Sequence, residues 1–404
     1  MRTNLLKTLP IASAAALALG AAIPALADAP AAAAPTPLVS YSGLFDGYWA
    51  FQFNNPKDTN LITAGGATRY YDTRHNTPTL ALGELNAWHT AAPGGLGFKV
   101  TLGAGDIAEI NGFGGAAGGS STTKPSFGGA SSTHEGQFKS LMQAYGTYAG
   151  KSGWGIDFGK FYTPIGYEVT ESNGNMNETH SVPFATIPFY HTGIRAYTPS
   201  MKGLVLTGYV VQAVYNTATA GVENDAKTAS FVGSAFWTDP KGKWVIGDSF
   251  GFGKNKFNLT LAGTDPTKNK ITVNDTDITY NFDPTNIGGL DYTYAQTKPD
   301  NNSDSFKATD NSWAAYYKHI LNPTSDVAVR YSGGEFKNDA PGFNKIKPWE
   351  ATITYEKHPA TNFLYRVEYQ HSGANQDFFL DKDSLTTKKS QDVLEVAGIF
   401  SFSG

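Results

Sequence analysis

The sequence contains no cysteine, so neither a disulfide framework nor a thiolate metal site can hold the fold together. Charged residues make up 16% of the chain and the formal net charge is −4, which argues against a nucleic-acid partner. Beyond the first residues, no stretch is apolar for long enough to form a membrane helix. Helical periodicity is also nearly absent. These absences favour an all-β protein that is stabilised by packing, lipid or assembly.

The first 27 residues predict a secretory signal peptide. Arg2 and Lys7 give a positive start, an Ala/Leu-rich stretch runs from Leu9 to Leu26, and small residues end it at Ala27. We therefore expect export and cleavage after Ala27. An Ala/Pro-rich leader would follow over residues 28–39, and a single domain over residues 40–404.

What the sequence does contain is a series of extended runs with alternating character. In the run at 363–371, Phe363, Tyr365 and Tyr369 fall on one face of a strand, whereas Arg366 and Glu368 fall on the other. A soluble sandwich would turn the apolar face inward, and a membrane barrel would turn it outward to lipid. Alternation alone does not distinguish these two structures.

The connections between the runs alternate between short turns and long loops. The short turns are rich in Pro, Gly, Asn and Asp, which are turn formers. They lie at 90–95, 151–153, 199–203, 239–243, 283–289, 322–326 and 358–361. The strands between them are predicted at 40–53, 79–89, 96–104, 140–150, 154–162, 191–198, 203–215, 229–238, 243–263, 271–282, 289–297, 311–321, 326–335, 348–357, 362–371 and 391–402.

Short turns at one rim and long loops at the other are the layout of an outer-membrane barrel. We therefore predict an all-β fold: a single transmembrane antiparallel β-barrel of about 16 strands, with short periplasmic turns and long extracellular loops. At this strand number the lumen is too wide for side chains of the wall to fill, so water would occupy it.

Two motifs carry a resemblance to a known family. The first is GKFYTPIGYE at Gly159–Glu168, and the second is PFYHTGIR at Pro188–Arg195. Together they resemble the outer-membrane β-barrel porin family called porin-2, or OmpL-like. Relatives usually carry an arginine-bearing segment between the two motifs, whereas Asn173–Ser181 contains no arginine here. The resemblance implies a pore, and in general porins the loop at the place of 163–190 folds inward and narrows the channel.

Charged residues in and around this loop are candidates for lining or narrowing the pore. The candidates are Lys160, Glu168, Glu171, Glu178, Arg195, Arg330, Arg366 and Glu368. We expect Lys160 and Arg195 to face the lumen from their strands. For Glu171 and Glu178 two interpretations stay open, a solvated outer loop or a constriction opposite wall cations. Because the lining would be mixed in sign, we expect a weak ion preference.

The sequence therefore predicts an outer-membrane porin of a Gram-negative-type bacterium that gives passive diffusion to small hydrophilic solutes or ions. We expect lipids and lipopolysaccharide as its surroundings, a homotrimer as the oligomer to consider, and no catalytic residue, cofactor or metal. His180 and His191 lack the spacing of a metal site. Two rival hypotheses are a secreted soluble β-protein that binds or hydrolyses carbohydrate, and a structural barrel with a blocked lumen.

Overall fold

The computed structural model describes residues 39–57, 68–72, 74–111, 141–215, 228–256, 268–299, 307–339, 342, 345–383 and 387–404. The predicted signal peptide and all of the predicted leader except its last residue lie outside these residues. The prediction that cleavage follows Ala27 therefore stays a prediction.

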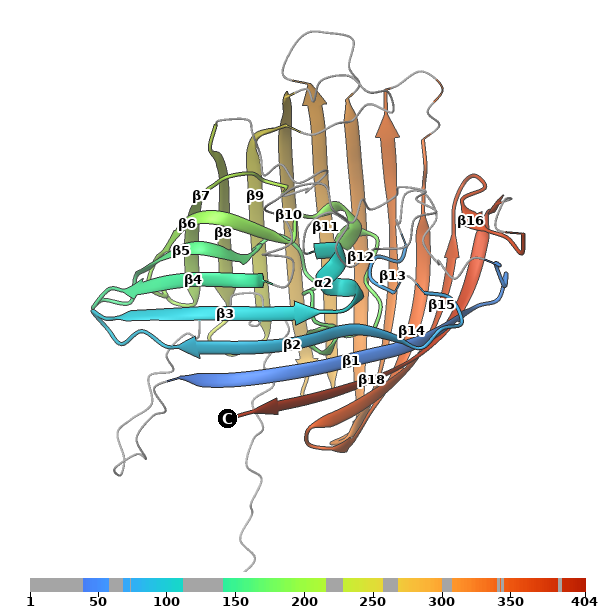
Figure 1. Ribbon diagram of the computed structural model, residues 1–404, viewed down its shortest axis with the longest axis horizontal. Coiled ribbons are helices and arrows are strands. Elements are labelled where there is room, and N and C mark those ends of the chain that lie inside the picture. Colours follow the sequence, from blue (N-terminus) through green and yellow to red (C-terminus); the bar gives the residue numbers. More distant parts are fainter. Residues whose placement is uncertain are drawn as a thin grey trace, which may run out of the picture.

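Sixteen antiparallel strands form one closed barrel within the described chain (Figure 1). Their bounds are β1 Ser40–Gln52, β2 Thr79–His89, β3 Leu96–Ala104, β4 Leu141–Ala149, β5 Gly155–Tyr162, β6 Tyr190–Tyr197, β7 Leu204–Val211, β8 Ser230–Thr238, β9 Trp244–Lys256, β10 Lys268–Asp283, β11 Asn286–Pro299, β12 Ala308–Asn322, β13 Ser325–Asn338, β14 Trp349–Ala360, β15 Phe363–Gly373 and β18 Ser390–Ser403. The predicted strand number and fold class are confirmed.

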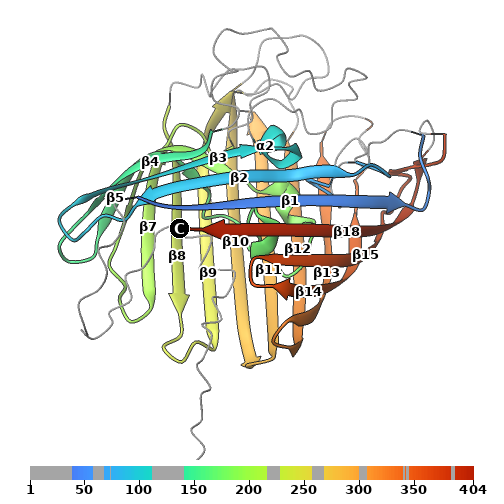
Figure 2. The ribbon, with the colours of Figure 1, turned by 60° about the horizontal axis from the view of Figure 1, so that its bottom comes forward.

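The barrel closes because the last long strand pairs with the first. Strand β18 is antiparallel to β1 from the Ser42–Ser403 pair to the Gln52–Val393 pair, and it also pairs with β15. Figure 2 shows β1 and β18 side by side, running in opposite directions. Closure leaves no unpaired strand edge, which is the condition for a sheet to stand in hydrocarbon.

The apolar face of the sheet is the outer face. On β15, Val367 and Tyr369 are 38% and 41% exposed, whereas Arg366 and Glu368, which alternate with them, are each 1% exposed. Their partner strand repeats the pattern, because Ile353 is exposed and stands opposite Tyr369. A soluble sandwich would bury the aromatic side chains and expose the charges, so the soluble carbohydrate-binding alternative does not fit this arrangement.

Short turns connect neighbouring strands at one end of the barrel. Each of the seven short connections follows an even-numbered strand from β2 to β14, so all of them lie at the same end of the barrel. The strand predicted at 243–263 is observed as β9 over Trp244–Lys256, and residues 257–267, which follow it, lie outside the described residues. Asp283 illustrates the turns, because its carboxylate accepts hydrogen bonds from the backbone and hydroxyl of Thr285.

In the described part of the chain, helical structure is limited to short segments. The helix α2 spans Asp106–Asn111, and two 3-10 turns, η2 at Ser172–Gly174 and η3 at Pro183–Thr186, lie between β5 and β6. A separate two-stranded sheet joins β16 (Phe379–Leu380) to β17 (Thr387–Lys388). Among the described residues, no helix is long and apolar enough to cross a membrane.

Candidate constriction inside the barrel

The connection between β5 and β6, residues 163–189, folds inside the barrel. We call it the inner loop. Its base is closed by a hydrogen bond from the backbone N–H of Thr163 to the carbonyl of Phe189. Most of its residues are buried, and its contacts reach wall strands that are more than 100 residues away in the sequence. In Figures 1 and 2 this green segment lies between the near and far walls of the barrel.

One end of the inner loop is held by an apolar cluster. Ile165, Phe184 and Ile187 are buried, and Phe184 packs edge-on against Tyr71 from the segment between β1 and β2. Gly166 enables the turn into this cluster, because its φ is +111° and a Cβ there would lie 2.2 Å from the Cδ1 of Ile187. Its backbone N–H donates to Asp275 of β10 at 3.0 Å. The loop is thus anchored to β10, a wall strand four positions along the sheet from β6.

Arg366 of β15 holds the middle of the inner loop through main-chain contacts. Its guanidinium donates to three loop carbonyls, at 2.7–3.0 Å, those of Ser172, Asn175 and Asn177. The same group pairs with Glu356 of β14 and with the loop carboxylate of Glu178, at 2.6 and 3.2 Å. Arg366 is 1% exposed, and its buried positive charge is compensated by the negative charges of these two carboxylates.

Arg330 of β13 holds the next part of the inner loop in the same way. Its Nε donates to Glu350 at 2.8 Å, and Nη1 donates to Glu168 at 3.1 Å. Nη1 and Nη2 also donate to the carbonyl and the hydroxyl of Thr179. The planar guanidinium therefore joins two wall strands to two separate points of the loop, which a lysine ammonium would not match in geometry.

Glu368 provides a hydrogen-bond acceptor for the loop amides, which the two arginines cannot provide. Its carboxylate accepts from the backbone N–H groups of Glu178 and Thr179 at 2.7 and 3.2 Å. The hydroxyl groups of Thr179 and of Thr354 on the neighbouring strand also donate to it. With Glu368 and the two arginines, both the amide and the carbonyl side of the loop backbone find partners on β13–β15.

Burial shifts the pKa values of ionisable side chains in the inner loop. It raises the pKa of Glu178 well above its usual range, the nearby acid Asp46 adds to the rise, and Arg366 opposes it. Burial also raises the pKa of Glu168, against the opposing charge of Arg330. It lowers the pKa of His180 to about 3, so this imidazole is neutral at physiological pH.

A second segment adds to the same network. Arg69, in the segment between β1 and β2, donates to Gln370 at 2.7 Å and pairs with Glu395 and Asp72. The adjacent Tyr71 stacks edge-on against His180 of the inner loop. Polar and aromatic side chains from two loops thus meet on the inner face of β15 and β18.

Comparisons with known proteins agree with this architecture. The family model described as "Putative beta-barrel porin-2, OmpL-like" matches residues 39–402. The chain belongs to this family. A search of curated protein sequences finds no match.

Solved structures show the same fold at low identity. The outer-membrane channel DcaP of Acinetobacter baumannii is 13% identical, with a TM-score of 0.57 over 90% of this chain and 97% of that chain. The anion-selective porin from Comamonas acidovorans is 13% identical, with a TM-score of 0.56 over 90% and 99%. The trimer form of OmpT from Vibrio cholerae is 10% identical, with a TM-score of 0.56 over 90% and 99%. Family and fold together identify an outer-membrane porin.

Five of the eight charged residues singled out in this porin's sequence meet in one network. They are Glu168, Glu178, Arg330, Arg366 and Glu368. Arg195 also faces inward but stands apart, paired with Asp157 at 2.6 Å and lying over the ring of Phe161. Glu171 interacts with Glu84 of β2. Of the two interpretations of Glu178, the structure places it against Arg366 rather than on a solvated surface.

Lys160 does not face the lumen. It shares a strand face with Ile156 and Phe158, which are exposed on the outer side, and it stands opposite the outward-facing Thr192. Its ammonium donates to the carbonyl of Leu141 and lies 4.1 Å from the centre of the Tyr190 ring. Strict alternation along β5 sets this orientation. A lysine near a strand end can keep its charge at the rim while its stem lies along apolar surface.

Sequence reasoning missed part of the network. Glu350 and Glu356 lie on the inner face of β14, where the alternation with Trp349, Ile353 and Tyr355 could have placed them. Arg69 gave no such signal, because it lies in a connection without periodicity. Its partners on the barrel wall, Gln370 and Glu395, are more than 300 residues away along the chain.

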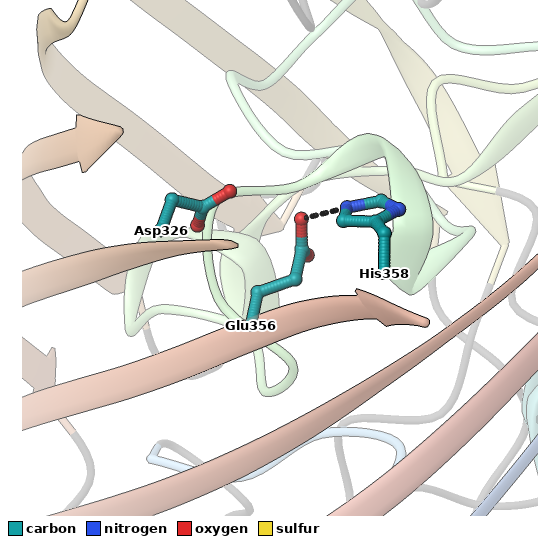
Figure 3. Close-up of side chains that lie close together, drawn as sticks. All are labelled: Asp326, Glu356 and His358. Carbon is teal, nitrogen blue, oxygen red and sulfur yellow. Dashed lines mark hydrogen bonds and ion pairs between the residues drawn. The ribbon is translucent and has the colours of Figure 1, made fainter. Parts of the chain in front are cut away.

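A further group of ionisable side chains lies towards the short-turn end. Asp326, Glu356 and His358 lie close together, and Figure 3 shows the contact between His358 and Glu356, which is 2.7 Å long. Lys318 lies 3.2 Å from Asp326 and 3.7 Å from Glu356, and Arg366 pairs with Glu356 as well. These cations already compensate the carboxylates, so the group is an ion-pair network rather than a metal site.

Proposed function

We propose that this outer-membrane porin gives small hydrophilic solutes and ions a passive route through the barrel, and that the inner loop sets the width of that route. The proposal is carried by one observation: a polar inner loop is seated across the polar interior of a closed barrel whose apolar face is external. Such a barrel can hold a water-filled path through its lumen while hydrocarbon surrounds its outer face. Neither the family nor the fold points to catalysis.

The residues of the network have complementary roles in this proposal. Arg330, Arg366 and Glu368 are the wall groups that hold the loop, and Glu168 and Glu178 are the loop carboxylates that meet them. Because most of their hydrogen bonds go to the loop itself, their first effect is on the position of the loop. Solute selection would follow from the space and charge that remain beside it.

The location and surroundings of the protein are part of the same proposal. We infer export by the signal peptide and insertion into the outer membrane of a Gram-negative-type bacterium, where lipid and lipopolysaccharide cover the apolar outer face. Among the structural neighbours, one is described as a trimer form. A homotrimer is therefore the assembly to test, by mass measurement of the detergent-solubilised protein.

Planar-bilayer recording of the purified, refolded full-length mature chain tests the function. We expect discrete and steady conductance steps, and swelling of proteoliposomes in solutions of small sugars. A barrel with a blocked lumen would insert but give neither steps nor swelling, and that result would overturn the proposal.

A further inference from the structure

The interior of the barrel contains far more acid than base. Among the described residues that are buried, the charged side chains comprise fourteen acids and four arginines, with no lysine. The acids are Asp46, Asp72, Glu84, Asp157, Glu168, Glu178, Asp275, Asp277, Asp291, Asp326, Glu350, Glu356, Glu368 and Glu395. The sequence suggested a lining of mixed sign, and both signs are present, but acids are in excess among these buried residues.

The four arginines are all engaged with particular acids. Arg69 pairs with Asp72 and Glu395, Arg195 with Asp157, Arg330 with Glu168 and Glu350, and Arg366 with Glu178 and Glu356. None of these four arginines pairs with an acid on the inner wall formed by β10 and β11. Of the seven buried acids that pair with none of these arginines, three lie together on β10 and β11.

Three aspartates occupy that wall. Asp275 and Asp277 are on the inner face of β10, and Asp277 stands directly opposite Asp291 of β11. The charged groups acting on Asp277 are Asp275 and Asp248, and those acting on Asp291 include Asp275 and Asp277, all of them acids. We call Asp275, Asp277 and Asp291 the aspartate triad.

The hydrogen bonding of the triad is incomplete. Asp275 is satisfied by the N–H of Gly166 at 3.0 Å and the hydroxyl of Thr293 at 2.5 Å. In contrast, Asp277 is 8% exposed and Asp291 is 4% exposed, yet the Oδ1 atom of each has no hydrogen-bond partner. A buried carboxylate oxygen without a donor is costly, so it needs a proton or a cation from outside the protein.

We propose that the porin prefers small cations over anions and that the aspartate triad is a cation-binding step on their route beside the inner loop. This inference rests on the proposed function, because it presupposes a conducting lumen. The triad lies directly under the loop, since Gly166 contacts Asp275 and Tyr167 contacts Thr279, two residues along β10 from Asp277. A cation that enters there meets fixed negative charge with no arginine to compete for it.

The reversal potential under a KCl gradient tests the inference. The wild-type porin should reverse towards the potassium equilibrium potential. In the double variant Asp277→Asn/Asp291→Asn, the permeability ratio of K⁺ to Cl⁻ should fall roughly twofold or more. The matched control is Asp392→Asn, which removes one carboxylate from the outer face of β18, where its side chain is 37% exposed, and should leave the ratio unchanged.

A second measurement separates loss of binding from loss of folding. In the wild type, conductance at low KCl should exceed proportionality to bulk salt, because fixed charge concentrates K⁺; the double variant should lose this excess while retaining steady steps. Steady steps with no cation preference in the wild type, or a double variant with the wild-type ratio, would overturn the inference and leave the proposed function standing. A protein that gives no steps at all would overturn the proposed function instead.

Discussion

At the scale of single residues, the position of the inner loop depends on a few buried side chains that are far from the loop in the sequence. Arg366 alone satisfies three loop carbonyls and two carboxylates. Removing one partner of a buried ion pair leaves the other as an uncompensated buried charge, and this typically costs about 3–5 kcal/mol. Such a loss is large compared with the stability of a docked loop.

Arg366→Met should therefore release the inner loop. We expect larger and noisier single-channel conductance and a lower thermal unfolding temperature in detergent. Arg74→Met is the matched control, because Arg74 is about one-third exposed and its pair with Asp106 is 3.5 Å long. An exposed pair contributes only about 0–1 kcal/mol. Wild-type noise and conductance in the Arg366 variant would contradict the role assigned to this arginine.

His180 should make the docking of the inner loop sensitive to acid. Its pKa is about 3 in the docked loop and would return towards its usual 6.5 in a released loop. Between these values the released loop binds the extra proton, so docking weakens as the pH falls, by up to about 2 kcal/mol at pH 5. Channel noise should thus rise more from pH 7 to pH 5 in the wild type than in His180→Gln.

The loop acids do not confuse this comparison. The raised pKa values of Glu168 and Glu178 mean that the docked loop binds protons more tightly, so these groups favour docking as the pH falls. Both proteins carry them, and the difference between the two proteins isolates the histidine. Equal pH responses in the two proteins would show that His180 stays buried whenever the channel opens.

At the scale of elements, strands and turns were predictable whereas the inner loop was not. Dipeptides such as Asp239-Pro240 and Asn322-Pro323 mark turns by local backbone preference, and period-2 alternation marks the strands between them. The contacts of the loop join residues 150 or more positions apart, such as Thr179 to Arg330 and Asn177 to Thr354. No local signal encodes such pairs. Lys160 faces outward, against the prediction, because the alternation along β5 and not the charge of the side chain sets its direction.

Replacing the central part of the inner loop, residues 169–186, by a Gly/Ser linker should widen the channel. Strands β5 and β6 keep their own pairing from Gly155–Tyr197 to Tyr162–Tyr190, so the barrel should still close. The arginines that lose their loop partners would then face water instead of protein, which removes the desolvation cost. We expect single-channel conductance to rise roughly twofold or more, as for a pore freed of its narrowest part. An unchanged conductance would place the constriction elsewhere.

At the scale of the whole molecule, the distribution of polarity is the reverse of that in a soluble protein, and a charged probe can report it. Ile353 lies on the outer face midway along β14, and Leu321 lies on the outer face at the short-turn rim. Both are about half exposed, so a protein surrounded by water would accept lysine at either place with little change.

In a membrane the two positions should differ. Ile353→Lys should lower the free energy of unfolding by about 2–4 kcal/mol, because the ammonium would lie near the bilayer midplane, and Leu321→Lys by no more than about 1 kcal/mol. Reversible denaturant unfolding from lipid vesicles measures both values. Equal and small effects at the two positions would mean that the outer face around Ile353 contacts water or protein rather than lipid. In that case the assignment of the outer face, on which the channel depends, would be wrong.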